Sequence, residues 1–182
     1  MMIRASDNTS LARIGLLSDS HGRAATTQRA VRLLLDQQVD LLLHLGDVGN
    51  LDVIDALIEQ IDEAGDLEPK VHAVFGNCDW DSDAMARYAD SLGVRVDHPV
   101  GRLTIDGKTL VFQHGHQAAA MDQALAEGVD YLCHGHTHRQ RDERVGSTRV
   151  INPGALFRAA EYTVAVLDVG KDELQFYTVP EV

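Results

Sequence analysis

The stretch Val129-Asp-Tyr-Leu-Cys-His-Gly-His-Thr-His138 is an apolar segment that ends in a polar loop. The apolar part is short and bounded by turn-type residues, which is typical of a buried β-strand. His136 and His138 are two residues apart, so extended backbone places both imidazoles on one side. Neutral imidazole is the commonest metal ligand in proteins, although a surface loop with two histidines also fits this pattern. The rest of the chain must decide between these alternatives.

The same pattern occurs at four more places along the chain. Short apolar strands are expected over 12–18, 40–45, 71–75 and 109–113. The loops after them contain Asp19 and His21, Asp47, Asn77, and His114 with His116. Each residue has an ordinary alternative, such as a helix cap, a turn residue or a surface histidine. Independent loops would not place ligand-type side chains after five strands of one chain, so together they predict a metal site.

Helices are expected between the strands of the first half. Apolar residues at helical spacing predict one helix over about 26–38 and a second that Asn50 caps and that runs through Ile61. A third is expected to begin at a Ser82 cap, after a turn at 65–69. This alternation of strands and helices predicts a parallel sheet, in which ligands bind beyond the carboxyl ends of the strands.

The second half changes to short strands joined by hairpins. Strands are expected at 94–97, 102–105, 139–144, 148–151, 162–169 and 173–179, with a helix around Met121 to Leu125. We expect this half to form a second, mixed or antiparallel sheet. Two sheets packed face to face with helices outside give the predicted fold, a four-layer α/β/β/α sandwich of the α/β class. We expect one domain over 1–182, with a loose tail at 1–11.

Composition narrows the function classes. The chain has 182 residues and a net charge of −12, from 16 basic and 28 acidic residues. Such a chain repels polyanions, so binding to polymeric nucleic acid is not expected. We see no signal peptide and no membrane-spanning run. The two cysteines, Cys78 and Cys133, fit a reducing compartment. We therefore expect a soluble cytoplasmic protein.

The kind of ligand indicates the kind of metal. Mixed His, Asp and amide-oxygen ligands suit Mn²⁺, Fe²⁺, Co²⁺ or Zn²⁺. A pair of metal ions needs an anionic bridge, for which Asp47 is suited. No cysteine is needed as a ligand, which argues against a structural zinc site.

In chain order, the motifs Asp-x-His, Gly-Asp, Gly-Asn-x-Asp, His-Gly-His and Gly-His-x-His resemble the calcineurin-like metallophosphoesterase superfamily. The resemblance covers about residues 13–169 and is strongest to the small bacterial and archaeal phosphodiesterases. It implies two divalent metal ions, Mn²⁺ first, with Fe, Co, Ni or Zn as alternatives. It implies one ion at Asp19, His21 and His138, the other at Asn77, His114 and His136, and Asp47 as the bridge. The choice of His114 over His116 follows only from the family's order of motifs.

The resemblance also implies the reaction. A metal-bridging hydroxide would hydrolyse a small phosphodiester substrate. Many members have a histidine near the leaving group where this chain has Cys78, and a thiol is a poor replacement as a proton donor. The candidates for that role are therefore His116, Cys78 and His134, although Cys78 also fits a packing role.

Other functions remain open at this point. A phosphomonoesterase would use the same site, and a retromer subunit with this fold serves mainly as a protein-binding scaffold. The scaffold predicts lost ligands, whereas all seven positions here keep ligating residue types. Trp80 and Phe157 are candidates for a homo-oligomer contact, for lining the site, or for simple packing.

Overall fold

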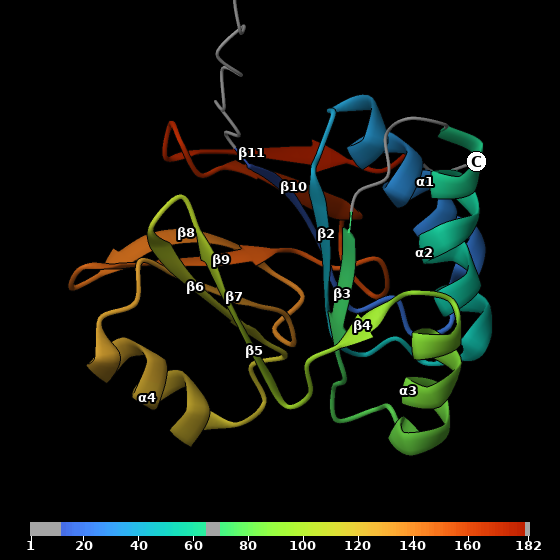
Figure 1. The fold of residues 1–182 in the computed structure, drawn as a ribbon, viewed down its shortest axis with the longest axis horizontal. Coiled ribbons are helices and arrows are strands. Elements are labelled where there is room, and N and C mark those ends of the chain that lie inside the picture. Colours follow the sequence, from blue (N-terminus) through green and yellow to red (C-terminus); the bar gives the residue numbers. More distant parts are fainter. Residues whose placement is uncertain (1–11, 65–69, 181–182) are drawn as a thin grey trace, which may run out of the picture.

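The computed structural model describes residues 12–64 and 70–180. The expected tail at 1–11 and the expected turn at 65–69 lie outside the described residues. Two β-sheets stack face to face, and helices cover the outer face of each (Figure 1). The predicted α/β class and four-layer arrangement are therefore confirmed.

The first sheet has the strand order β11-β10-β1-β2-β3-β4. Its strands are β1 (Arg13–Leu17), β2 (Leu41–Leu45), β3 (Lys70–Val74), β4 (Arg95–Val96), β10 (Thr163–Asp168) and β11 (Glu173–Thr178). β1 to β4 run parallel, whereas β10 pairs antiparallel with β1 and with β11. Both faces of β1 and β2 are covered, which explains why their sequences are almost continuously apolar.

The second sheet has the strand order β5-β6-β7-β9-β8 and is mixed. Its strands are β5 (Val100–Ile105), β6 (Lys108–Gln113), β7 (Tyr131–His134), β8 (Gln140–Val145) and β9 (Thr148–Pro153). The prediction that strands 94–97, 162–169 and 173–179 belong here is wrong, because β4 pairs with β3 and β10 pairs with β1. Every residue of β10 is buried, so this strand needs a neighbour on each side. Apolar pattern alone does not say which sheet provides those neighbours.

In the part of the chain that the structure describes, four helices cover the sheets. They are α1 (Ala24–Asp36), α2 (Leu51–Ala64), α3 (Ser82–Ser91) and α4 (Ala118–Glu127). The first three lie on the outer face of the first sheet, and α4 lies on the second (Figure 1). Asn50 caps α2 as predicted, since its Oδ1 accepts from Val53 N at 3.2 Å. The predicted Ser82 cap is wrong: the carboxylate of Asp81 accepts from Ala84 N, and Ser82 is the first helical residue.

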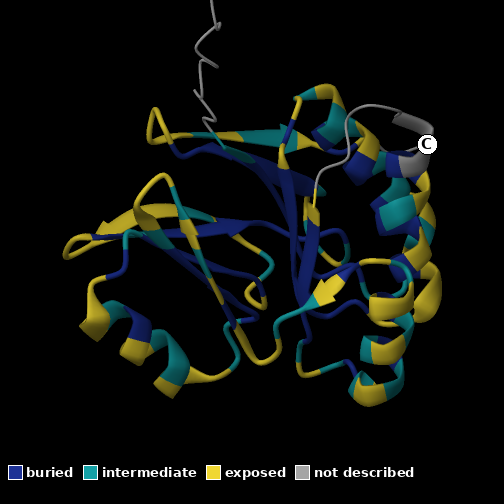
Figure 2. Cartoon of the chain, in the orientation of Figure 1, coloured by how far each residue is buried: buried dark blue, intermediate teal, exposed yellow. Residues whose placement is uncertain are grey.

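The apolar core lies in three layers between these elements. Alternation along β1 places Ile14 and Leu16 between the two sheets and Leu17 under the helices. Phe112 and Cys133 extend the layer between the sheets, and both are fully buried. Figure 2 shows this as buried strands inside and exposed outer faces on the helices. Among the described residues, no helix combines the length and apolar character that crossing a membrane requires.

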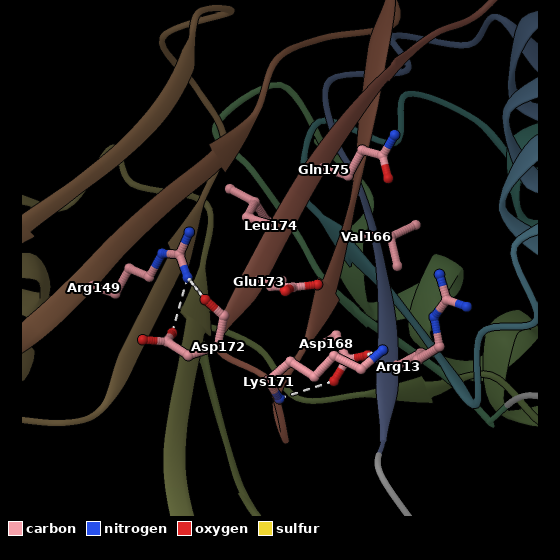
Figure 3. Close-up of a pocket in the computed structure, with 9 residues that line it drawn as sticks. All are labelled: Arg13, Arg149, Val166, Asp168, Lys171, Asp172, Glu173, Leu174 and Gln175. Atoms are coloured by element: carbon pink, nitrogen blue, oxygen red, sulfur yellow. Dashed lines mark hydrogen bonds and ion pairs between the residues drawn. The ribbon is translucent and has the colours of Figure 1, made fainter.

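A charged hollow lies at the amino end of β1, where Arg13 begins the strand (Figure 3). Two of its three cations, Arg149 and Lys171, are paired with acidic neighbours within it, whereas Arg13 has no acidic partner among the described residues. Arg149 Nη1 is 2.8 Å from Asp172 Oδ1, and Lys171 Nζ is 3.2 Å from Asp168 Oδ2. The predicted metal ligands follow the carboxyl ends of β1, β2, β3, β6 and β7, at the opposite end of the strands.

Candidate metal centre

The loops after β1 and β2 are joined by backbone hydrogen bonds. Asp19 N donates to Gly46 O at 3.0 Å, and His21 N donates to Asp47 O at 2.9 Å. In the second sheet, Gly135 N donates to His114 O at 2.9 Å and so ties the loops after β6 and β7 together. These bonds satisfy loop backbone that would otherwise be buried without partners.

Five predicted ligands have left-handed backbone, which non-glycine residues seldom adopt. Their φ angles are 57° for Asp19, 43° for His21, 53° for Asp47, 69° for His136 and 56° for His138. Each such residue costs on the order of 1–3 kcal/mol, and strain of this kind concentrates at functional sites. The loop hydrogen bonds hold these residues in the strained conformation.

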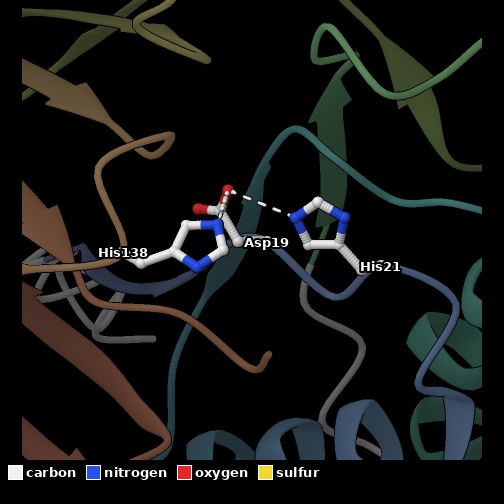
Figure 4. A group of neighbouring side chains, drawn as sticks. All are labelled: Asp19, His21 and His138. Atoms are coloured by element: carbon white, nitrogen blue, oxygen red, sulfur yellow. Dashed lines mark ion pairs between the residues drawn. The ribbon is translucent and has the colours of Figure 1, made fainter. Parts of the chain in front are cut away.

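Asp19, His21 and His138 form one cluster (Figure 4). Their candidate ligand atoms all lie within 4.8 Å of one another. Asp19 Oδ1 is 3.1 Å from His138 Nε2 and 4.0 Å from His21 Nε2. The second oxygen of Asp19 accepts from His136 N at 3.1 Å, which orients the carboxylate. The three residues predicted to hold the first ion are therefore together in the structure.

Asp47 lies between this cluster and His114. Its Oδ2 is 3.3 Å from His21 Nε2 and 3.4 Å from His114 Nε2. Its Oδ1 accepts from Cys78 N at 2.9 Å. Two further groups of potential ligands contain Asp47, one with Asp19 and His114 and one with His21 and Cys78. A carboxylate shared in this way has the position expected of a bridge between two cations.

The polar atoms of the cluster fit a cation. Asp19 Oδ1, His21 Nε2 and His114 Nε2 are buried and make no hydrogen bond within the part of the chain that the structure describes. Buried polar atoms without partners are costly, and a carboxylate with imidazole nitrogens is a donor set for a borderline divalent ion. His114 Nδ1 contacts Leu45 O at 2.8 Å, the outer-shell contact that orients metal-binding histidines.

Charge and burial set the protonation of these groups. Burial opposes ionisation of Asp47, but the interaction with His114 and the Cys78 N–H outweigh it and hold the pKa below its ordinary value. Burial raises the pKa of Asp19 and lowers that of His21. At His114 burial acts to lower the pKa, but the neighbouring Asp47 carboxylate leaves it raised. The lowered pKa of Asp47 and the raised pKa of His114 together describe a carboxylate that favours a positive charge beside it. A bound metal ion would supply that charge in place of the proton on His114.

Comparison with known proteins identifies the family. Residues 12–172 match the calcineurin-like phosphoesterase superfamily domain. The chain belongs to this superfamily. Phosphodiesterase MJ0936 of Methanocaldococcus jannaschii is 27% identical over 166 residues, which are 88% of this chain and 95% of that protein. Phosphodiesterase YfcE of Escherichia coli K12 is 30% identical over 145 residues, which are 76% of each.

A solved structure described as a novel archaeal phosphodiesterase superposes with a TM-score of 0.78 at 26% identity. The superposition covers 91% of this chain and 99% of that one. The resemblance and the metallophosphoesterase-like fold predicted from the sequence are thereby confirmed.

Two predicted ligands of this phosphoesterase, Asn77 and His136, have exposed side chains. Asn77 is exposed, and its amide contacts only Cys78 Sγ, at 3.5 Å, among the described residues. The His136 side chain is exposed, with its ring centroid 5.1 Å from that of His114. Their assignment to the second ion stays a prediction.

The three candidates for the proton donor have different surroundings. His116 is half-buried beside His114, with ring centroids 5.4 Å apart, and burial lowers its pKa. Cys78 lies in one of the clusters, and burial, helped by Asp47, raises the pKa of its thiol. His134 is buried against Asn152 and Arg141 instead, at 3.4 Å and 3.3 Å. His116 and Cys78 therefore lie beside the candidate ligands, whereas His134 contacts Asn152 and Arg141, and the choice of proton donor stays a prediction.

Sequence analysis missed two buried residues that organise the phosphoesterase site. The Asp79 carboxylate accepts from Gly49 N at 2.7 Å and from Gly76 N at 2.8 Å, and so links the loops after β2 and β3. His44 Nε2 contacts Ser20 Oγ at 2.8 Å in the core beneath the site. Asp79 belongs to the Gly-Asn-x-Asp motif, and His44 interrupts an apolar strand. Both residues could be seen in the sequence, but neither was a predicted metal ligand, so neither was given a role.

Proposed function

We propose that this phosphoesterase is a metal-dependent phosphodiesterase with a two-metal site that acts on a small phosphodiester. The observation that carries the proposal is that the Asp47 carboxylate is shared between His21 on one side and His114 on the other. The relatives named phosphodiesterase support the reaction class. We assign Asp19, His21 and His138 to one ion, Asn77, His114 and His136 to the other, and Asp47 to both, with Mn²⁺ as the first choice of metal.

A bound pair of divalent ions would supply Lewis-acid activation of water and of the phosphoryl group. The chain supplies the charge and the geometry around it. Cys78 N–H fixes one oxygen of Asp47 and leaves the other free for the cations. We assign the His116 imidazole, whose ring neighbours that of His114, to the stabilisation of charge on the phosphoryl oxygens. The raised pKa of the Cys78 thiol makes it a weak acid, so turnover should favour esters with good leaving groups.

The test is a metal-reconstituted activity panel. Purified protein should bind Mn²⁺ by elemental analysis and hydrolyse bis-p-nitrophenyl phosphate faster than p-nitrophenyl phosphate and cyclic nucleotides. Asp47→Asn should lower kcat on the diester at least about a hundredfold, because the shared carboxylate is lost. Asp122→Asn, on the exposed face of α4, is the matched control and should keep wild-type activity. Near-normal activity of Asp47→Asn with full metal loading would contradict the assignment.

The alternatives give different results in the same panel. A phosphomonoesterase would prefer p-nitrophenyl phosphate. A protein-binding scaffold would bind no metal and show no Mn²⁺-dependent hydrolysis. We also propose a cytoplasmic location, since Cys78 and Cys133 are both free thiols. A homo-oligomer stays a prediction, and of its two candidate contacts Trp80 is 92% exposed whereas Phe157 packs beside His21.

A further inference from the structure

An aromatic ring with two arginines lies beside the candidate metal centre. The ring of Phe157 packs against that of His21, with centroids 5.0 Å apart. The guanidinium carbons of Arg23 and Arg158 lie over the same Phe157 ring, at 4.9 Å and 5.0 Å from its centroid. Phe157 is half-buried and both arginines are exposed. Two cations therefore share an aromatic ring that packs against a predicted metal ligand.

These two arginines have no acidic partner among the residues that the structure describes. Arg149, by contrast, is paired with Asp142 and Asp172. Other described arginines, such as Arg87 and Arg139, also have no acidic partner, so what sets Arg23 and Arg158 apart is the aromatic ring that they share. The two guanidinium groups are also no more than about 10 Å apart, a separation at which 0.1 M salt screens like charges incompletely. An anion that contacts both guanidinium groups would relieve this repulsion.

The loop that carries Phe157 and Arg158 is fixed on both sides. Leu156 N donates to Ser18 O at 3.2 Å, which ties the loop to the end of β1 next to Asp19. Thr163 N donates to Ala155 O at 3.3 Å, and the Thr163 hydroxyl donates to Pro153 O at 2.8 Å. A rigid support of this kind lowers the entropy lost when an arginine binds a ligand.

We propose that Arg23 and Arg158, supported by Phe157, form an anion clamp that makes this enzyme select phosphodiesters bearing a second anionic group. The inference rests on the proposed phosphodiesterase function and names its substrate class. Guanidinium groups bind carboxylates and phosphates through paired hydrogen bonds, so the second group is an oxyanion of either kind. The metal centre would take the scissile phosphodiester, and the clamp would take the oxyanion on the alcohol portion that stays bound.

The experiment uses diesters that share one leaving group. The substrates are 2-carboxyethyl, 2-phosphoethyl and 2-carbamoylethyl p-nitrophenyl phosphate, and the Mn²⁺-loaded enzyme is assayed at low and at moderate salt. The wild type should show at least about tenfold higher kcat/KM for an anionic ester than for the neutral amide, mainly through KM. Comparing kcat/KM for the carboxyethyl and phosphoethyl esters shows which oxyanion the enzyme prefers. Equal kcat/KM for all three substrates would overturn the proposal.

The variants separate a clamp from simple packing. Arg23→Gln and Arg158→Gln should each reduce the anionic-to-neutral ratio of kcat/KM, and the double variant should bring it close to one. Arg158→Lys should recover only part of the ratio, because a lysine keeps the charge but loses the paired hydrogen bonds. Arg87→Gln, an exposed arginine of α3, makes the same charge change and should leave the ratio at its wild-type value. A ratio that stays constant in the Arg23 and Arg158 variants would overturn the proposal.

A binding measurement distinguishes failure of the clamp from failure of the phosphodiesterase assignment. Calorimetry with methyl 2-carboxyethylphosphonate and its carboxamide analogue needs no turnover. The wild type should bind the carboxylate at least about tenfold tighter, and the Arg23→Gln/Arg158→Gln double variant should not discriminate. If no diester is hydrolysed but this preference holds, the proposed reaction fails and the clamp stands. If diesters are hydrolysed without any preference, the clamp fails alone.

Discussion

Cys78 interacts with Asp47 mainly through its backbone. The N–H of Cys78 holds Asp47 Oδ1 at 2.9 Å, and any residue other than proline can keep that bond. The thiol itself has a raised pKa and is a weak proton donor. We therefore expect Cys78→Ser to change kcat on bis-p-nitrophenyl phosphate by less than about threefold, since this ester needs little leaving-group protonation. Steady-state kinetics at matched metal content measures this, and a hundredfold loss would show that the thiol takes part in the reaction.

His44 links stability to pH. It is fully buried, and burial, helped by the nearby His114, lowers its pKa to about 3. In the unfolded chain the histidine pKa is about 6.5, so between pH 6.5 and pH 3 the unfolded chain binds more protons than the folded one. The contribution of neutral His44 to stability is therefore complete above about pH 6.5 and is lost as the pH falls toward 3. The contribution is at most about 1.4 kcal/mol per pH unit.

Urea unfolding of metal-free protein between pH 7 and pH 5 should therefore show a shallower fall in stability for His44→Gln than for the wild type. The comparison uses the slope with pH, so an overall loss of stability in the variant does not affect it. Parallel slopes would mean that His44 is not kept neutral by the fold.

At the level of elements, glycine allows the ends of adjacent strands to approach each other. A Cβ on Gly76, which follows β3, would lie 2.1 Å from Asp47 Oδ1 and 2.6 Å from Asp47 N. Gly76→Ala must therefore displace the shared carboxylate, and we expect Mn²⁺ affinity to fall about 10–100-fold. Calorimetric titration with Mn²⁺ measures it. Gly146→Asn, in an open hairpin turn at φ 62° that asparagine tolerates, should bind Mn²⁺ like the wild type. An unchanged Mn²⁺ affinity in Gly76→Ala would show that the loop after β3 can move without displacing Asp47.

Sequence pattern predicted which strand ends carry the candidate ligands but not how their side chains are arranged. Asp19, Asp47 and His114 were found because ligand-type residues followed apolar strands, and parallel strands bring such ends together. The place of Cys78 in a cluster could not be predicted, because it depends on a loop conformation that Asp79 fixes through backbone hydrogen bonds. The Arg23 and Arg158 pair was missed for the same reason, since Phe157 brings together residues more than 130 positions apart.

For the whole molecule, metal binding should contribute to stability. The candidate ligands come from loops of both sheets, so a bound ion ties the two halves of the sandwich together. An ion that binds only the folded chain, at a hundred times its Kd, adds about 2.7 kcal/mol. For a chain of this size that corresponds to a rise in Tm of roughly 5–10 °C. Calorimetric scans with Mn²⁺ and with a chelator measure the shift. Asp47→Asn should lose most of it, and a wild-type Tm that does not respond to metal would contradict the proposed site.

The assignment of strands to the two sheets was the main error at this scale. The sequence predicted the number and type of layers, since amphipathic helices and buried strands require them. It did not predict that the closing hairpin of β10 and β11 returns to β1. That choice depends on register and contacts between distant residues, such as Gly15 opposite Val166, which local periodicity does not contain.

The pairing of β10 with β1 has a consequence for the order in which the protein is made. While the ribosome synthesises residues 18 to 162, at least one edge of β1 has no partner, and its unpaired backbone N–H and C=O groups are open to other chains. The strand that pairs with this edge, β10, is nearly the last to be synthesised. Until then the nascent chain has an unpaired strand edge and is prone to aggregate. We expect nascent chains to depend on chaperones until β10 is released, and C-terminal truncations before Thr163 to be insoluble rather than merely inactive.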